Sequence, residues 1–137
     1  MRTITRVGAA LATTAALVTL TATQASAAVT WLWEKADGNN IGTASYTDTG
    51  NVMHVNDQEA DGHSLLLFVH RPGVASGVAC WDSTGADTSG VNCTLNSYDE
   101  NTLLEGYLCR GEWASNPDDR VIFWDRCNYA GARQFRK

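Results

Sequence analysis

The sequence has little positive charge and, after its first residues, no long apolar run, and each shortage excludes a class of protein. The 137 residues carry 10 Lys and Arg against 15 Asp and Glu, a net charge of −5. Binding to nucleic acid depends on neutralising phosphates with Lys and Arg, so we expect no nucleic-acid partner. No segment reaches the roughly 20 apolar residues that span a bilayer, so we also expect no membrane span.

The sequence also lacks the common catalytic motifs. It has three histidines and contains no H-E-x-x-H, no G-x-S-x-G and no C-x-x-C pattern. These are the spacings that zinc hydrolases, serine hydrolases and many metal or redox sites require. We therefore expect a protein that is not an enzyme and needs no cofactor. A small secreted hydrolase with an unrecognised site is kept as an alternative.

Residues 1–27 have the three parts of a secretory signal peptide. Arg2 and Arg6 precede an apolar stretch at 7–20, and small residues follow, ending in Ala25-Ser26-Ala27. A signal peptidase accepts such an A-x-A site. Cleavage after Ala27 would leave 110 residues with a net charge of −7. We therefore predict a secreted, extracellular protein.

All four cysteines lie in the predicted mature part, at Cys80, Cys93, Cys109 and Cys127. An even number in an exported protein indicates two disulfides, for which three pairings are possible. We favour Cys80–Cys93 and Cys109–Cys127, because each pair brackets one turn-rich segment between two strand-like runs. Loops of this length are worth roughly 3 kcal/mol per bridge in the chain-entropy treatment. A structural zinc site is the alternative.

Short β-like runs separated by Gly, Asn, Asp and Ser clusters fill the mature sequence. The predicted strands are 31–35, 42–47, 52–56, 64–70, 78–82, 91–95, 102–109 and 120–127. The continuous apolar run 65–69 predicts a strand buried on both faces. The spacing favours an all-β, immunoglobulin-like two-sheet sandwich of seven or eight strands, with a small closed β-barrel as the alternative.

The charge is uneven near the end of the chain. Residues 125–137 carry four basic side chains against Asp125. We predict one sandwich domain at 28–127, followed by a solvated basic tail at 128–137.

Much of 41–127 resembles a group of small secreted actinobacterial proteins of unknown function. The resemblance rests on Ala-Asp-Gly-His-Ser at 60–64, Cys80-Trp81 and Glu-Gly-Tyr-Leu-Cys at 105–109. It implies a disulfide-bonded β-sandwich and brings no activity with it.

An acidic turn offers a possible metal site. Asp57, Glu59 and Asp61 alternate before Gly62, like the opening of a calcium loop. The place of the bidentate Glu in such a loop is taken by Phe68. An acidic hairpin turn without an ion explains the same residues.

The histidines offer a second possible site. If strands 52–56 and 64–70 pair through the turn between them, His54 and His70 would approach across the hairpin. Such a pair could bind a transition metal or transfer protons. The alternative is that the histidines are independent surface residues.

The five tryptophans are the most suggestive feature of the composition. Exposed aromatic rings can stack on sugars or anchor a partner protein. Trp113 lies in the second disulfide loop and is expected to be exposed, whereas Trp81 and Trp124 are expected in the core. Trp31 and Trp33 share one face of a strand, and core packing competes with binding there.

These observations predict a secreted, monomeric, non-catalytic protein that binds an extracellular protein or glycan through Trp113, with Trp31 and Trp33 as further candidates. The alternative is a secreted hydrolase inhibitor. In that case the disulfide-closed segment 110–126 would present a rigid loop to its target, because preorganisation reduces the entropy lost on binding.

Overall fold

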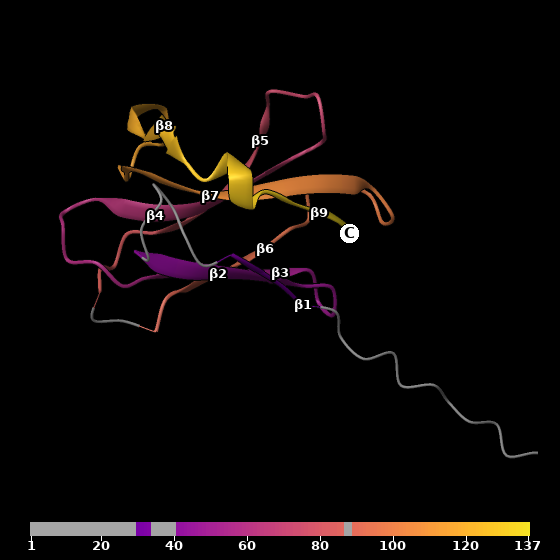
Figure 1. Cartoon of the computed structure of the whole chain (residues 1–137), viewed down its shortest axis with the longest axis horizontal. Helices are drawn as coiled ribbons and strands as arrows, with labels where there is room; N and C mark the ends of the chain where they lie inside the picture. Colours follow the sequence, from indigo (N-terminus) through magenta and orange to yellow (C-terminus); the bar gives the residue numbers. More distant parts are fainter. Residues whose placement is uncertain (1–29, 34–40, 87–88) are drawn as a thin grey trace, which may run out of the picture.

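The computed structural model describes residues 30–33, 41–86 and 89–137, and these form two antiparallel sheets packed face to face (Figure 1). The four-stranded sheet has the order β1-β2-β3-β6: Thr30–Trp33, Gly42–Thr47, Val52–Asp57 and Val91–Thr94. The five-stranded sheet has the order β5-β4-β7-β8: Gly77–Asp82, Ser64–His70, Leu103–Glu112 and Val121–Cys127. Its fifth strand, β9 (Arg133–Arg136), also pairs with β7.

Two short 3-10 helices, η1 (Pro117–Asp119) and η2 (Tyr129–Gly131), flank β8. The described strands form two open layers rather than a closed barrel, so the predicted all-β sandwich is confirmed. No helix in the described part of the chain is long and apolar enough to cross a membrane. The predicted signal peptide at 1–27 lies outside the described residues.

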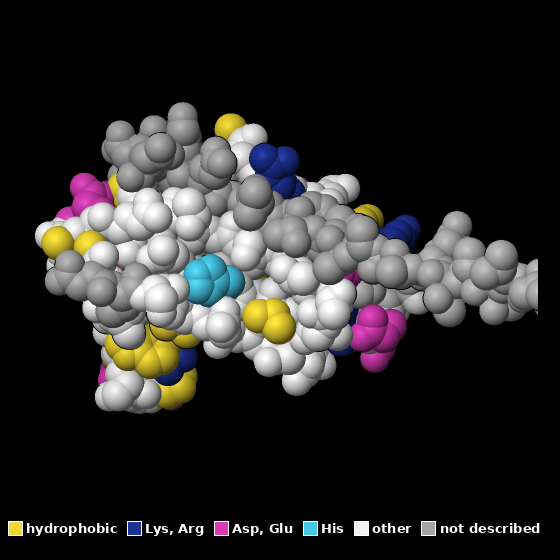
Figure 2. All heavy atoms as spheres, turned by 90° about the horizontal axis from the view of Figure 1, so that it is seen from below, with side chains coloured by type: hydrophobic (Ala, Val, Ile, Leu, Met, Phe, Trp, Pro, Cys, Tyr) yellow, Lys and Arg dark blue, Asp and Glu magenta, His cyan; other side chains and the backbone are white. Residues whose placement is uncertain are grey.

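The four-stranded sheet has one buried face and one polar face. Buried and partly exposed residues alternate along β2 and β3, and the register pairs Ala44 with Val55 and Tyr46 with Met53. These four side chains therefore point at the other sheet. Figure 2 views the opposite face, on which the charged and hydrophobic side chains of the described residues are few and scattered.

Strand β4 is buried along almost its whole length, as its apolar run predicts. Leu65, Leu67 and Val69 belong to the core between the sheets, whereas Leu66 and Phe68 belong to a second cluster. The second cluster lies on the outer side of the five-stranded sheet. Ile122 of β8 and Ala132, directly after η2, pack against it on that side.

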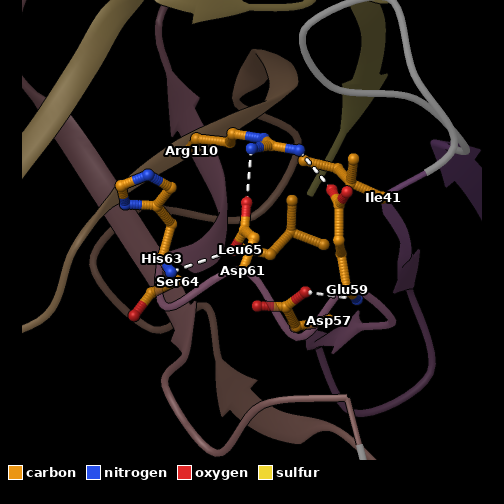
Figure 3. A pocket seen from close by; sticks show the side chains of 8 residues that line it. All are labelled: Ile41, Asp57, Glu59, Asp61, His63, Ser64, Leu65 and Arg110. Carbon is orange, nitrogen blue, oxygen red and sulfur yellow. Dashed lines mark hydrogen bonds and ion pairs between the residues drawn. The ribbon is translucent and has the colours of Figure 1, made fainter.

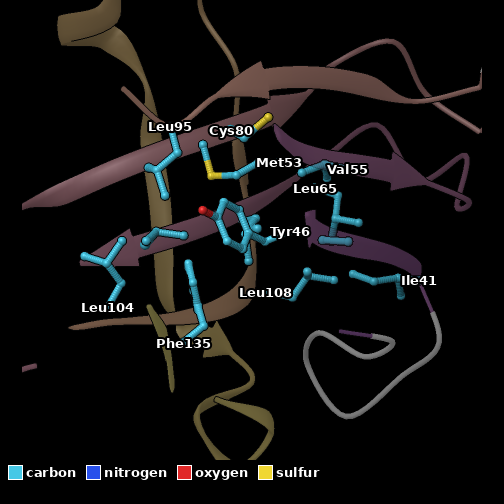
Figure 4. Close-up of a cluster of buried hydrophobic side chains, with 13 residues drawn as sticks. Ile41, Tyr46, Met53, Val55, Leu65, Cys80, Leu95, Leu104, Leu108 and Phe135 are labelled. Carbon is cyan, nitrogen blue, oxygen red and sulfur yellow. The ribbon is translucent and has the colours of Figure 1, made fainter. Parts of the chain in front are cut away.

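The main core lies between the two sheets (Figure 4). Its centre is the fully buried Tyr46, whose ring centroid lies 4.5 Å from that of Phe135. The Tyr46 hydroxyl donates a hydrogen bond to Asn51 Oδ1 at 2.8 Å, so the one polar atom of this ring has a partner.

Both favoured disulfides are confirmed. Cys80–Cys93 joins β5 to β6 and therefore links the two sheets, whereas Cys109–Cys127 joins β7 to β8 within one sheet. The β7–β8 register shifts between Cys109 and Arg110, directly beside the second bridge.

The basic segment at 128–137 is part of the sandwich rather than a tail that follows it. Strand β9 pairs with β7, and Phe135 is buried in the core while Arg133 and Arg136 are exposed. The Lys137 amide donates to the Thr102 carbonyl at 3.1 Å. The apolar side chain of Phe135 anchors the segment in the core, whereas its immediate neighbours Gln134 and Arg136 lie on the exposed face of the strand.

The expected approach of His54 and His70 does not occur, because β3 and β4 belong to different sheets. His54 Nδ1 lies 2.8 Å from Asn92 Oδ1 on β6. His70 Nδ1 donates to the Val74 carbonyl at 2.8 Å. The two histidines are therefore separate.

Candidate functional site

The outer side of the five-stranded sheet carries two exposed aromatic rings that rest on two buried ones. Phe68 on β4 and Tyr107 on β7 form the buried layer, with ring centroids 5.7 Å apart. Trp124 meets Phe68 edge-to-face at 5.1 Å, and Tyr129 packs on Tyr107 at 4.8 Å. Trp124 remains 47% exposed and Tyr129 52% exposed. We call these four residues the aromatic face.

The two exposed rings are held in place by several contacts. The Tyr129 hydroxyl donates to the Trp124 carbonyl at 2.9 Å. The Asn128 side chain caps η2 by accepting from the Gly131 amide at 2.9 Å, and Cys127, immediately before this turn, is tied to β7 by its disulfide. A ligand that met these rings would therefore find them already ordered, which lowers the entropy lost on binding.

A polar pair borders the aromatic face. His70 packs against Phe68 at 5.6 Å and Tyr107 at 5.4 Å, and its Nε2 lies 3.7 Å from Glu105 Oε2. Burial, with smaller contributions from Tyr129 and Glu105, raises the pKa of Tyr107, so its phenol stays neutral at physiological pH. The Glu105 carboxylate, about one-quarter exposed, can accept hydrogen bonds from a ligand beside the rings.

Trp113 is 41% exposed, yet its ring is less accessible than this figure suggests. The Arg120 guanidinium lies 3.6 Å from the ring centroid, and Arg120 Nε donates to the Ala114 carbonyl at 2.9 Å. Trp81, which is buried as expected, packs beside the same ring at 6.1 Å. One face of Trp113 is therefore already occupied by a cation of this chain.

Trp113 is exposed as expected, and Trp124 is exposed as well. The expectation that Trp124 lies in the core is wrong, because β8 sits on the outer edge of the sheet and leaves one side of this ring in solvent. Trp31 and Trp33 belong to β1, and their side chains lie outside the described residues. Tyr129 was not among the candidates predicted from the sequence, because no strand-like pattern surrounds it.

The acidic turn holds an arginine where a calcium ion was considered (Figure 3). The register places Arg110 of β7 opposite Leu65, and its largely buried guanidinium pairs with the carboxylates of both Glu59 and Asp61. The Asp57 carboxylate instead accepts from the Glu59 amide at 3.1 Å. Among the described residues no three His, Cys, Asp or Glu side chains are grouped to hold a metal ion. The calcium interpretation is therefore replaced by an internal ion-pair cluster.

A buried carboxylate lies behind this turn. Asp82 has no exposed surface, and its oxygens accept from the Asp57 amide at 2.8 Å, the Thr84 amide at 3.0 Å and the Thr84 hydroxyl at 2.5 Å. Three donors of this kind offset the cost of burying a charge. Burial also raises the pKa of Asp57, against the hydrogen bond from the Glu59 amide, which lowers it.

His63 forms a carboxylate–imidazole pair that no sequence motif indicated. Its Nδ1 lies 2.6 Å from Glu112 Oε1, and its ring meets Phe123 edge-to-face at 5.5 Å. The two partners are 49 residues apart and meet because β4 pairs with β7. With Nδ1–H donating to the carboxylate, the neutral ring keeps Nε2 as an acceptor.

Comparisons of the chain with protein-family models, with curated proteins and with solved structures found no match.

Proposed function

We propose that the protein is an exported, non-catalytic binding domain that takes a neutral saccharide chain on its aromatic face. The observation that carries this proposal is the pair of exposed rings, Trp124 and Tyr129, fixed over the buried rings of Phe68 and Tyr107. The two disulfides are compatible with export, as such bonds persist in oxidising compartments.

The arrangement favours a saccharide over a protein partner. Each exposed ring rests on its own buried ring, so each keeps a surface on which the C–H face of a sugar can pack. Glu105 beside them supplies an acceptor for hydroxyl groups. A protein partner would need about 800 Å² of matching surface around a continuous apolar centre, which two rings do not provide.

The net charge of the protein favours neutral saccharides over anionic ones. The chain has an excess of acidic residues, and its predicted mature part carries a net charge of −7. Long-range repulsion by this net charge disfavours anionic polysaccharides, although the segment 125–137, which carries Tyr129, is locally basic. We therefore expect an uncharged chain as the ligand.

The test is retention of the oxidised protein on a panel of neutral and anionic insoluble polysaccharides. Trp124→Ala and Tyr129→Ala should each weaken retention on the neutral ligand about tenfold or more, since each removes one aromatic anchor. Trp113→Ala is the matched control, because Trp113 is similarly exposed but its ring is covered by Arg120. Equal losses from Trp113→Ala and Trp124→Ala, or no retention on any polysaccharide, would refute the proposal.

A hydrolase inhibitor is the second candidate, and the hairpin between β7 and β8 favours it. Asn116 caps η1 by accepting from the Asp118 amide at 3.3 Å, and Arg120 closes the loop on Trp113. This gives an exposed, rigid tip above a disulfide. Inhibition of a protease or glycosidase that is lost in Pro117→Gly and kept in Trp124→Ala would establish this candidate in place of the first.

A further inference from the structure

A polar groove lies at the end of the sandwich, apart from the aromatic face. One wall is the turn 59–64 and the other is the turn 83–86, with a cavity of about 290 Å³ between them. Gly62 and Gly85 adopt positive φ angles of 83° and 80°, so each wall turns through a residue without a side chain. The groove is near the lower end of the size range of small-molecule sites.

The two walls are held by one buried side chain. Asp82 accepts from the amide of Asp57, which leads into the first wall, and from the amide and hydroxyl of Thr84 in the second wall. Because Asp82 is fully buried, this connection is protected from competing water. The relative position of the two turns is therefore fixed by the fold.

The first wall is braced a second time from β7. Arg110 pairs with Glu59 and Asp61, and Asp61 Oδ1 accepts from the His63 amide at 2.9 Å. Glu112 orients the His63 ring through Nδ1 at 2.6 Å. Support of this kind, in which neighbours fix the groups that line a cavity, is what a binding site requires.

The lining indicates the chemistry of a ligand. His63 offers an acceptor at Nε2 when neutral, and Ser64 and Ser83 offer hydroxyls, while Ala60 and Ala86 leave space. Such a lining contains both donors and acceptors, which the hydroxyl groups of a polyol or sugar require. The carboxylates of Glu59, Asp61 and Glu112 around this end disfavour an anion.

We propose that this groove is a binding site for a neutral polyhydroxylated unit, with His63 as a hydrogen-bonding residue. Such a unit could be a free polyol or one ring of a saccharide. The site lies beyond the function proposed above, because neither exposed ring of the aromatic face lines it.

The test is a titration of the oxidised, isotope-labelled protein, followed by the amide and imidazole NMR signals. The probes are sorbitol, glucose, N-acetylglucosamine, a neutral oligosaccharide and inorganic phosphate. We expect saturable shifts at 59–64 and 83–86 with Kd in the millimolar range for at least one neutral probe, as suits a small ligand. Saturation by sorbitol would indicate a polyol site, and saturation by sugars alone would indicate a saccharide unit.

Two variants and two controls decide the assignment. Ser83→Tyr fills the groove and His63→Ala removes the acceptor, and each should weaken binding at least tenfold. Ser115→Tyr on the exposed hairpin and His54→Ala on the other sheet should leave it unchanged. Thermal melts of all four variants would show that they are folded.

The proposal is overturned by an absence of saturable shifts, by shifts that survive in Ser83→Tyr, or by a preference for phosphate. Trp124→Ala separates this site from the aromatic face, because it should weaken polysaccharide retention and leave the groove titration intact. Either proposal can therefore fail without the other.

Discussion

The carboxylate of Asp82 accepts a hydrogen bond from the backbone amide of Asp57 at 2.8 Å, although the two residues belong to different sheets. Asp82 ends β5 and Asp57 ends β3, so this contact closes the sandwich at one corner. This hydrogen bond links the two sheets close to the polar groove. The Cys80–Cys93 disulfide links the same two sheets covalently.

Asp82→Ala should lower the free energy of unfolding by about 2–4 kcal/mol, because it removes the acceptor of the buried Asp57 amide and of the Thr84 amide and hydroxyl. Asp125→Ala is the control, since that carboxylate is exposed on β8. Urea denaturation followed by tryptophan fluorescence measures both. Equal stability of the two variants would show that the Asp82 contact is unimportant.

Replacing Cys80 and Cys93 by Ala should cost roughly 3 kcal/mol of stability through the loss of the cross-link between the sheets. Replacing Cys109 and Cys127 should also loosen β8 and η2, which carry Trp124 and Tyr129. We therefore expect polysaccharide retention to fall in the second variant even under conditions where both variants are folded. Retention that falls equally in both would argue against a role for the second bridge in ordering the aromatic face.

Phe135→Ala should destabilise the protein by about 3–5 kcal/mol, the usual range for removing a buried aromatic ring. Its ring packs on Tyr46 in the main core. Gln134→Ala, on the exposed side of β9, should change stability by less than about 0.5 kcal/mol. Thermal unfolding of both variants distinguishes a structural β9 from a dispensable tail, which would tolerate either change.

Burial, assisted by Glu100 and Asp48, raises the pKa of Tyr46 to about 12. An unfolded tyrosine titrates near 10, so the folded state holds its proton more tightly. The stability that this provides is complete below about pH 10 and is lost as pH rises through about 12. Phenolate absorbance recorded alongside circular dichroism should show Tyr46 ionising only as the protein unfolds, and Tyr46→Phe should remove this part of the alkaline transition.

The raised pKa of Asp57 acts in the same direction as that of Tyr46, because burial again disfavours the charged form, but its effect falls in the acid range. The stability linked to its proton is present in acid and is lost as pH rises through the carboxyl range. Asp57→Asn keeps an acceptor for the Glu59 amide and cannot ionise. The variant should match the wild type near pH 3 and exceed its stability at pH 7, as measured by denaturant titration. A variant that is less stable at pH 7 would contradict this account.

The sandwich could be predicted from the sequence because its signals are local. Polar turns at Asp48–Asn51 and Asp57–Gly62 mark the ends of the strands. The apolar run Leu65–Val69 indicates a strand that is buried on both faces. The disulfide pairing was predicted from the same turn-rich segments, since each pair of cysteines closes one short loop between two strands. Strand β9 was missed because residues 133–137 contain three basic side chains and a single phenylalanine, a composition typical of a solvated tail.

The candidate sites depended on contacts that no local pattern contains. The pairing of β4 with β7 brings Arg110 to the acidic turn and Glu112 to His63 across 49 to 51 residues, and so turns a possible calcium loop into an ion-pair cluster. The position of β8 at the sheet edge exposes Trp124, while Arg120 covers Trp113. The sequence by itself indicated strands β1 to β8, though not β9, and favoured the cysteine pairing that the structure has, because periodicity and turn chemistry act over a few residues. Only the tertiary structure decided which strands share a sheet, and with it which aromatic rings and carboxylates meet, because those energies arise between segments far apart in the chain.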